Sequence, residues 1–577
     1  MEKGPEKYTK GRNPRLFKAQ GGEWRLTTFE KKRILLNNIF GVDIDPQAVE
    51  VTKLSLLLKV LEGESEQTLS KQLKLFHERA LPDLDKNIRC GNSLIGPDFY
   101  HGKQIAVFDD EERYRINVFD WEAEFPEIMK AGGFDVVMGN PPYVRQEMLG
   151  DLKEYFRNHY AVYHGVADLY AYFIERGVSL LKAGGLFSYI VANKWMRANY
   201  GEPLRVWMKS RHIDEIVDFG DLPVFQKATT YPCIVRIASR KAALKFFAVQ
   251  VKDLEFDDLS HYVSEETYTV DQNGLADTGW SLSDERTQRL LNKIRAAGVP
   301  LGEYVKGKIY RGVLTGLNEA FVIDTATKER LIAEDPKNSE IIKPFLLGRD
   351  IKRYQQPFSN NYLILFPNGW TTKKSGNESN KWTWLKKEYP AIAKHLEPYE
   401  PRAEKRCDKG EFWWELRSCD YYAEFESPKL ILPDISLRGN FIIDMEGAFY
   451  CVNTAYIISN ADPYLLGLMN SSLITFFYKN LSASYRGGYL RFIYQYLIKL
   501  PVSVIDFSDH LQKNRHDKIV TMVDQMLSLH RKHASSKTAH EKTAIQRRID
   551  DTDRQIDLLV YELYGLTADE IKIVEGM

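Results

Sequence analysis

Phe134-Asp135-Val136-Val137-Met138-Gly139-Asn140-Pro141-Pro142-Tyr143 is an apolar run that leads directly into a proline-rich turn. The run Phe134–Gly139 predicts a short buried strand, because it is rich in Phe and Val and a turn bounds it. Two successive prolines fix the backbone and remove two amide donors. The pattern therefore predicts a strand that delivers a rigid loop, Asn140–Tyr143, to the end of a sheet.

This loop has the groups that are needed to hold an exocyclic amine. The side chain of Asn140 and the carbonyl of Pro141 offer two acceptors, and Pro142 has no N–H that could recruit that carbonyl. Binding both amine hydrogens draws the nitrogen toward tetrahedral geometry and exposes its lone pair to a methyl donor. Tyr143 offers a ring face for stacking a base, worth about 1–3 kcal/mol, once the base has left the duplex. For these four residues taken alone, a structural Pro-Pro turn is the alternative.

Short apolar runs alternate with helical segments on both sides of the loop. Strands are predicted at Asn38–Ile44, Ile88–Ile95, Gly185–Ala192, Ile213–Phe219 and Cys233–Ala238. Helices are predicted at Pro46–Leu61, Leu169–Leu181 and Pro203–Ser210. This alternation indicates an α/β domain with a largely parallel sheet.

The pattern changes after Arg240. Residues 241–283 look irregular, and Asp284–Ala297 predicts a connecting helix. Short β-type runs such as Ala320–Ile323 and Leu430–Leu432 follow between long loops, and an apolar face at helical spacing from His510 to Tyr564 favours a helical hairpin. We therefore predict four parts: an α/β domain (1–240), a connector (241–299), an α+β domain (300–505) and C-terminal helices (506–577).

The composition bounds the function. The chain has 577 residues, with 79 Lys and Arg against 79 Asp and Glu, so its formal net charge is zero. This balance weakens an expectation of nucleic-acid binding without refuting it, because a large protein can gather its cations on one face. Five scattered cysteines argue against disulfides and against a metal site, and they fit a reducing cytoplasm. The longest apolar runs are too short for a membrane span, and the N-terminus lacks the apolar core of a signal peptide.

Several stretches resemble one known family, in the expected order. Gly41–Leu58, Phe134–Arg145 and Asp168–Gly185 look like the gamma-class N6-adenine DNA methyltransferases of restriction-modification systems. Lys308–Phe321, Ile341–Ile351 and Trp413–Arg417 resemble the TaqI-like C-terminal specificity domain of that group. The resemblance implies a Rossmann-like methyltransferase sheet followed by a DNA-specificity domain. It also implies methyl transfer from S-adenosylmethionine to adenine N6 in double-stranded DNA, by a site-specific enzyme.

The same resemblance assigns a cofactor site. Asp43 matches the acid that binds the ribose hydroxyls of S-adenosylmethionine, a role that suits a carboxylate. Ile44 would pack on the cofactor adenine. Asn92 and Ser93 lie in the stretch that meets the adenine edge, where many relatives have Asp in place of Asn92.

It also assigns contacts to the target base and to DNA. Asn140–Tyr143 would hold the flipped base, and Phe225 matches an aromatic residue on its far side, although a buried core Phe is the plainer alternative. Basic side chains among residues 300–500 can neutralise phosphates or read guanine edges. On that ground DNA contacts are predicted from Arg311, Lys343, Arg349, Arg417 and Arg486. For each of these singly, a solvated surface cation is the alternative.

One motif of the family is missing from residues 1–40. The Gly-rich turn Asp-Pro-x-x-Gly-x-Gly-x-Phe, which lies under the methionine part of the cofactor, should precede Asp43. We therefore expect a partial methyltransferase sheet. Three explanations stay open: the downstream half of a split enzyme completed by an upstream polypeptide, a fragment or mis-assigned start, and an inactive relic.

Two other functions also stay open. One is a catalytically incomplete DNA-binding specificity subunit that needs an upstream partner. The other is methylation of a different amine, such as cytosine N4, RNA or a protein glutamine, because each offers an NH₂ group. The C-terminal helices could contact DNA, support the specificity domain or pair with a partner helix. The sequence shows no convincing nuclease cluster of two acids and a lysine, so the resemblance favours methylation over cleavage.

Overall fold

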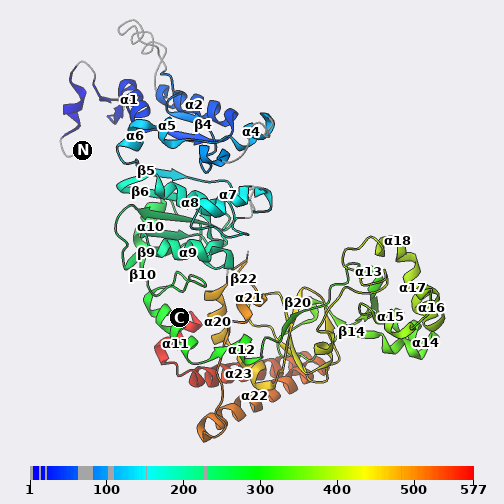
Figure 1. Ribbon diagram of the computed structural model, residues 1–577. Coiled ribbons are helices and arrows are strands. Elements are labelled where there is room, and N and C mark those ends of the chain that lie inside the picture. Colours follow the sequence, from blue (N-terminus) through cyan, green and yellow to red (C-terminus); the bar gives the residue numbers. More distant parts are fainter. Residues whose placement is uncertain are drawn as a thin grey trace. The chain divides into compact units, whose positions relative to one another are not determined.

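The protein is described here by a computed structural model (Figure 1). The structure describes residues 4–11, 14–19, 22–62, 82–101, 110–144, 146–150, 152–225, 230–482, 484–485 and 487–576. The chain divides into two compact units. Unit 1 comprises Met1–Ala192, Tyr200–Ile216 and Ile234–Ala243, and unit 2 comprises Asn193–Asn199, Val217–Cys233 and Leu244–Met577. In the part of the chain that is described, no helix is both long and apolar enough to cross a membrane.

Unit 1 begins with a small hairpin and two helices. The hairpin pairs β1 (Leu16–Lys18) with β2 (Trp24–Leu26), and helix α1 (Thr28–Asn38) follows with Thr27 as its N-cap. Helix α2 (Pro46–Leu61) has the bounds that the sequence predicts. Its start is fixed locally, because Pro46 suits the first turn and the Asp45 carboxylate accepts a hydrogen bond of 2.8 Å from the Gln47 amide.

Two short parallel strands flank helix α2. Strand β3 (Gly41–Asp43) pairs with β4 (Ile88–Cys90), and these two strands form a sheet of their own. Four short helices lie in sequence between β4 and the Asn140–Tyr143 loop: η2 (Pro97–Tyr100), α4 (Asp110–Ile116), α5 (Trp121–Glu124) and α6 (Pro126–Lys130).

A second, larger sheet carries the Asn140–Tyr143 loop. Its six strands are hydrogen-bonded in the order β10-β9-β7-β8-β6-β5, and β7 and β8 contribute residues to both units. The edge strand β5 (Phe134–Gly139) runs parallel to β6 (Leu181–Ala192), with Gly139 opposite Tyr189. The α/β prediction is confirmed by these elements: α7 (Leu152–His159), α8 (Tyr170–Ser179), α9 (Glu202–Lys209), β7 (His212–Asp218) and β8 (Pro232–Ala238).

The burial expected for two of the strands is wrong. The run Asn38–Ile44 yields only the three residues of β3, because Asn38 ends helix α1, and none of the three is fully buried. In β5, Val136 is 52% exposed and Met138 is 76% exposed. Strands of parallel sheets are normally covered on both sides. Each of these two strands has a hydrogen-bonded neighbour on one side only among the described residues.

The expectation of an irregular segment at 241–283 is also wrong. Strands β9 (Lys245–Gln250) and β10 (Tyr268–Asp271) form an antiparallel pair at one end of the larger sheet, with helix α10 (Leu259–Glu266) between them. Phe246 and Ala248 alternate with exposed residues in β9, which is the period-2 signal of a half-buried strand. The predicted connecting helix is confirmed as α11 (Glu285–Ala296).

The rest of unit 2 mixes small sheets with helices, as predicted. One four-stranded sheet has the order β12 (Ile309–Arg311), β20 (Ala455–Ser459), β16 (Lys429–Pro433), β18 (Ile442–Asp444). Another has the order β13 (Val322–Asp324), β15 (Asn361–Ile364), β14 (Ile342–Leu346), β19 (Tyr450–Cys451). The strand expected at Ala320–Ile323 is half wrong, because Ala320 and Phe321 end a helical turn, α13 (Asn318–Phe321).

Smaller strands and helices complete this part of unit 2. The small sheets contain β17 (Ile435–Ser436), β22 (Tyr489–Arg491) and β21 (Ser484–Tyr485), and the pair β11 (Val299–Pro300) and β23 (Pro501–Val502). The helices are α12 (Leu301–Tyr304), α14 (Thr325–Glu334), α15 (Trp370–Ser375), α16 (Lys381–Glu388), α17 (Pro390–Leu396), α18 (Glu400–Ala403), α19 (Pro463–Asn470), α20 (Ser472–Leu481) and α21 (Tyr494–Leu497).

The predicted C-terminal hairpin is confirmed. Helices α22 (His510–Ser535) and α23 (Ala539–Leu563) lie side by side and are followed by α24 (Ala568–Glu575) (Figure 1). Ile519, Val523 and Met526 from α22 and Ile556 and Val560 from α23 are buried in one hydrophobic core with α19 and α20. The hairpin is thus anchored in the body of unit 2.

Candidate active site

The Asn140–Tyr143 loop follows the end of strand β5. The side chain of Asn140 is exposed, Pro141 is buried and Tyr143 is partly buried. No described residue donates a hydrogen bond to the Asn140 side chain or to the Pro141 carbonyl. Among the described residues neither oxygen therefore has a competing donor, and the catalytic role of the loop remains a prediction.

The loop rests on an aromatic ring that the sequence did not single out. Gly139 lies opposite Tyr189, and a Cβ atom at position 139 would come within 3.0 Å of the Tyr189 ring. Only glycine lets the strand pass this close to the ring. Burial raises the pKa of Tyr189 to about 12, so the phenol stays neutral at physiological pH. Tyr189 therefore acts as a rigid, uncharged floor beneath the start of the loop.

The predicted cofactor residues lie at the ends of β3 and β4. Asp43 ends β3 with an exposed carboxylate, whose Oδ1 accepts a hydrogen bond of 2.9 Å from the Asp45 amide. The second carboxylate oxygen is open, so Asp43 suits a vicinal diol. Ile44 is 47% exposed beside it and offers an apolar contact surface.

Asn92 and Ser93 follow strand β4. The Oδ1 of Asn92 accepts a hydrogen bond of 3.1 Å from the Leu94 amide, so this oxygen stabilises a local turn. The carbonyl of Ser93 accepts a bond of 3.1 Å from the Trp121 indole. Sequence reasoning missed Asn117, whose Nδ2 lies 3.4 Å from the Ile44 carbonyl and 3.5 Å from Cys90 Sγ. Its left-handed backbone (φ 45°) is the kind of turn that Asn tolerates, but a lone Asn gives no sequence signal.

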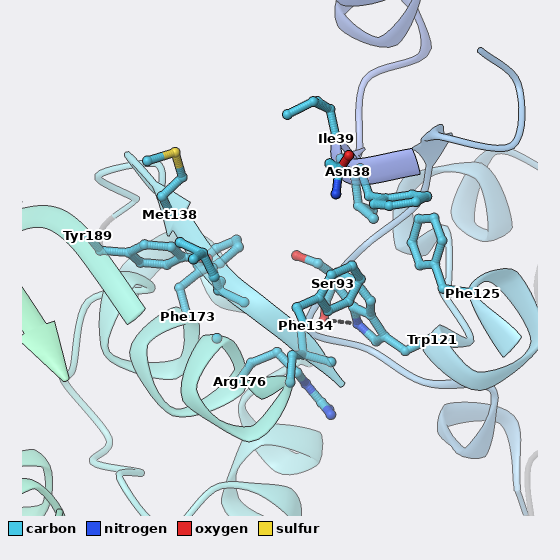
Figure 2. A pocket seen from close by; sticks show the side chains of 17 residues that line it. Asn38, Ile39, Ser93, Trp121, Phe125, Phe134, Met138, Phe173, Arg176 and Tyr189 are labelled. Atoms are coloured by element: carbon cyan, nitrogen blue, oxygen red, sulfur yellow. Dashed lines mark hydrogen bonds between the residues drawn. The ribbon is translucent and has the colours of Figure 1, made fainter. Parts of the chain in front are cut away.

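An apolar pocket of about 400 Å³ lies within unit 1, between β3 and β5. Figure 2 shows Met138, Tyr189 and Phe173 on one side and Ile39, Phe125 and Trp121 on the other. We call this pocket, with the open edges of β3 and β5, the strand gap. The sequence assigned none of its aromatic residues to a pocket, because they come from five separate segments: Phe40, Trp121 with Phe125, Phe134, Phe173 and Tyr189.

The described residues before β3 do not fill this gap. They form the β1–β2 hairpin and helix α1, and none of them builds a Gly-rich turn after a buried strand. A second apolar surface lies open on helix α2, where Val51, Leu54 and Leu58 share one face and are 63%, 57% and 59% exposed. Open apolar surfaces of this extent mark sites of interaction.

The residues predicted to contact DNA differ in how exposed their side chains are and in whether they already bind a partner within the chain. Arg349 has a side chain that is 79% exposed, with Asp350 4.0 Å away. Arg417 pairs with Asp408 at 3.3 Å, Lys343 pairs with Glu426 at 3.3 Å, and the Nε of Arg311 donates to the Asn453 carbonyl at 2.6 Å. Arg486 lies outside the described residues. Phe225 is partly buried and belongs to unit 2, so its stacking role also remains a prediction.

Part of the Trp413–Arg417 stretch has a structural role. The fully buried carboxylate of Glu415 accepts from the amides of Gly369, Thr371 and Glu411 at 3.0, 2.8 and 3.1 Å. Beside it, the Arg406 guanidinium donates to the carbonyls of Trp413 and Glu415 at 2.7 and 3.0 Å. Burial lowers the pKa of Arg406 to about 10. Sequence reasoning missed Arg406, whose partners are backbone carbonyls that leave no trace in a side-chain pattern.

No cluster of metal-ligating side chains occurs within the ranges that the structure describes. The larger open features of unit 1 are therefore the exposed loop, the exposed carboxylate of Asp43 and the strand gap. The loop follows one parallel strand of unit 1, and the carboxylate of Asp43 ends another.

Two family matches fit this geometry. Residues 37–225 match the Eco57I restriction-modification methylase, and residues 343–502 match the TaqI-like C-terminal specificity domain. The chain therefore carries a restriction-modification methylase domain followed by a TaqI-like specificity domain. This confirms the resemblance that the sequence indicated.

Individual relatives agree with this assignment. Over 99% of its length the chain is 24% identical to the type II restriction enzyme and methyltransferase RM.Eco57I of Escherichia coli, and it spans 58% of that protein. It is 27% identical to the type II methyltransferase M.PaeR7I of Pseudomonas aeruginosa, over 77% of this chain and 73% of that one. Among solved structures, the type IIL restriction-modification enzyme MmeI in complex with DNA has a similar fold. The TM-score is 0.59 at 13% identity, over 93% of this chain and 66% of that one.

Proposed function

We propose that this chain is the target-base and DNA-recognition part of a site-specific DNA methyltransferase that modifies adenine N6 with S-adenosylmethionine in a restriction-modification system. The observation that carries the proposal is the pair of open acceptors at Asn140 and Pro141. Adenine N6 is favoured over other amines because the loop and its flanks resemble the gamma-class N6-adenine enzymes. The specificity domain favours DNA over RNA or protein.

The chain's own residues would prepare the amine. The Asn140 side chain and the Pro141 carbonyl each accept one N–H of the adenine amine, which frees the nitrogen lone pair. Tyr143 stacks on the extruded base. The ring of Tyr189 packs against Gly139 and fixes the position at which the loop begins. The cofactor supplies an electrophilic methyl group. With the cofactor bound, the amine nitrogen would form the new N–C bond as the C–S bond of the sulfonium breaks and the thioether leaves, and the nitrogen would then release one proton to solvent, so the loop needs no strong base.

The cofactor fits only one half of the site. Asp43, with one carboxylate oxygen uncommitted, suits the ribose hydroxyls, and exposed Ile44 suits the adenine ring. The methionine part needs backbone donors and close approach on the other side of the strand gap. No described residue before Gly41 offers such a turn.

We further propose that a polypeptide strand from outside residues 1–577 fills the strand gap. Among the described residues β3 pairs only with β4 and β5 only with β6, so each strand has an open edge, and Val136 and Met138 of β5 are exposed. A strand between them would join the two sheets and bring its following turn beneath the cofactor. An upstream polypeptide that also covers Val51, Leu54 and Leu58 of α2 would account for the second open apolar face.

Two measurements test these proposals separately. Calorimetric titration of the isolated chain with S-adenosylmethionine should show weak or no binding, and co-expression with the polypeptide encoded directly upstream should restore it. Tight binding by the isolated chain would overturn the strand proposal alone. Mass spectrometry of DNA from cells with the complete system should detect N6-methyladenine; N4-methylcytosine in its place would overturn the adenine assignment.

A second function is favoured by the incomplete cofactor half. In that case the chain is a specificity subunit that binds DNA and contributes no catalysis. Methyl transfer by the completed complex, abolished by a change at Asn140, would exclude it.

A further inference from the structure

Charge is strongly separated along the α22–α23 hairpin. Residues 531–548, which form the tip, contain six Lys or Arg and one acid. The remainder of α23, residues 549–563, contains five acids and one Arg. A chain of zero net charge thus concentrates positive charge at one end of a long hairpin.

The cations of the tip are exposed and unpaired. All six side chains are exposed, and none forms an ion pair with a residue in the described ranges: Arg531, Lys532, Lys537, Lys542, Arg547 and Arg548. By contrast, acids nearer the base of the hairpin are engaged, as Asp553 is by Arg353 and Glu562 by Arg515. The positive charge at the tip is therefore available to an external anion.

Hydroxyl groups accompany these cations. An open hollow of about 650 Å³ at the tip is lined by Lys532, Lys537, Ser535, Ser536, Thr538 and Glu541, among others. The three hydroxyls donate to the Lys532 carbonyl or to Glu541, so the lysine ammonium groups are the donors that the hollow offers to phosphate oxygens. Both Lys and Arg bind phosphate oxygens, and a duplex presents a row of phosphates at regular spacing to such a group of cations.

The hairpin is fixed rigidly to the specificity domain. Arg353 donates to both oxygens of Asp553, at 2.7 and 2.5 Å, and Ser472 donates to Asp557 from its amide and its hydroxyl, both at 2.7 Å. A Cβ at Gly467 would lie 2.9 Å from Val523, so α19 packs directly on α22. From Asp553 to the N-cap Thr538 is 15 residues of helix, which is about 22 Å. The tip is thus held at a set distance from the specificity domain.

We propose that the tip of the hairpin, about 22 Å along α23 from the Arg353–Asp553 anchor, binds the phosphate backbone of duplex DNA. The inference rests on the proposed function only in taking DNA as the partner. The contact adds affinity without reading sequence, since phosphates are the same at every step. It gives the C-terminal helices two of the roles left open by the sequence: they support the specificity domain at their base and contact DNA at their tip.

The test compares two double variants of the full chain. K532Q/K537Q removes two cations at the tip, and K513Q/K518Q removes two exposed, unpaired cations nearer the base of the same helix α22. Affinity for a long duplex of mixed sequence is measured by fluorescence anisotropy over a range of salt concentrations, without methyl donor. The slope of log K against log salt is negative, and each lost phosphate contact lowers its magnitude by about 0.9. We expect a fall of up to about 1.8 for the tip variant and no change for the control.

Every outcome bears on the inference. An unchanged slope in K532Q/K537Q, or an equal fall in both variants, overturns it, and so does a wild-type chain that does not bind DNA. Loss of DNA affinity in the tip variant with unchanged slope would also count against phosphate contact. Because the assay contains no methyl donor, failure of methyl transfer elsewhere leaves this result interpretable. Unchanged thermal unfolding of both variants establishes that the fold is intact.

Discussion

Replacing Met138 by Asp should weaken docking of the missing strand without harming the isolated chain. Met138 is 76% exposed on the open edge of β5 and lines the strand gap. Burying a whole Met side chain is worth about 1.5–3 kcal/mol, so covering the exposed three quarters gives about 1–2 kcal/mol. A carboxylate in its place adds a desolvation cost of about 2 kcal/mol. Together these predict a loss of about 3 kcal/mol, or about 100-fold in Kd.

The assay is calorimetric or anisotropic titration of the upstream polypeptide onto wild-type and M138D chains. The matched control is M445D, because Met445 is 52% exposed and lies in unit 2. M445D should bind the upstream polypeptide like wild type, and both variants should keep the wild-type circular dichroism. Equal affinity of M138D and wild type would refute the reasoning, since it would mean that the β5 edge stays uncovered in the complex.

Three further predictions concern other parts of the molecule. In the completed enzyme, N140A should lower kcat by about 100-fold or more, because one of two acceptors for the amine is lost, while DNA affinity stays within about twofold; a parallel loss of DNA affinity would contradict a role confined to the amine. E415A should destabilise unit 2 by about 3 kcal/mol, because three backbone donors lose their buried acceptor, and E415Q should lose less; a denaturant midpoint equal to wild type in E415A would contradict this. Burial lowers the pKa of His395 and of His530. Unfolded His titrates near 6.5, so the unfolded state gains protons first as pH falls below that value, and the thermal midpoint should drop there; H395Q/H530Q should flatten this drop, and an equally steep drop in the variant would exclude these residues as its source.

Local signals in the sequence predicted much of the fold. Pro46 and Asp45 define the start of helix α2, and the apolar period from Ile519 to Leu559 defines the hairpin, because both depend on neighbours in the chain. Burial of β3 and β5 could not be predicted in this way. An apolar run predicts a strand that suits a buried position. The exposure of its side chains depends on which distant segments pack against that strand.

The site residues divide along the same line. The Asn140–Tyr143 loop was found because its chemistry lies in four consecutive residues. Tyr189, Asn117 and Arg406 were missed because each contacts backbone of a distant segment: Gly139, Ile44 and Thr315 respectively. Glu415 was assigned to a recognition motif, yet its buried carboxylate accepts from three backbone amides.

The target-base half and the cofactor half of the proposed site are supported by different strands. The proposed target-base half is supported within unit 1, because β6 pairs with β5 and the Tyr189 ring lies against Gly139. The cofactor half depends on β3 and β4, a two-stranded parallel sheet with one open edge, and such small sheets are marginal on their own. A strand in the gap would therefore do more than add a binding loop. It would make β3 and β5 members of one sheet and so hold Asp43 at a fixed distance from Asn140. Cofactor affinity and catalysis should then rise together when the strand docks, whereas DNA affinity, carried by unit 2, should change little.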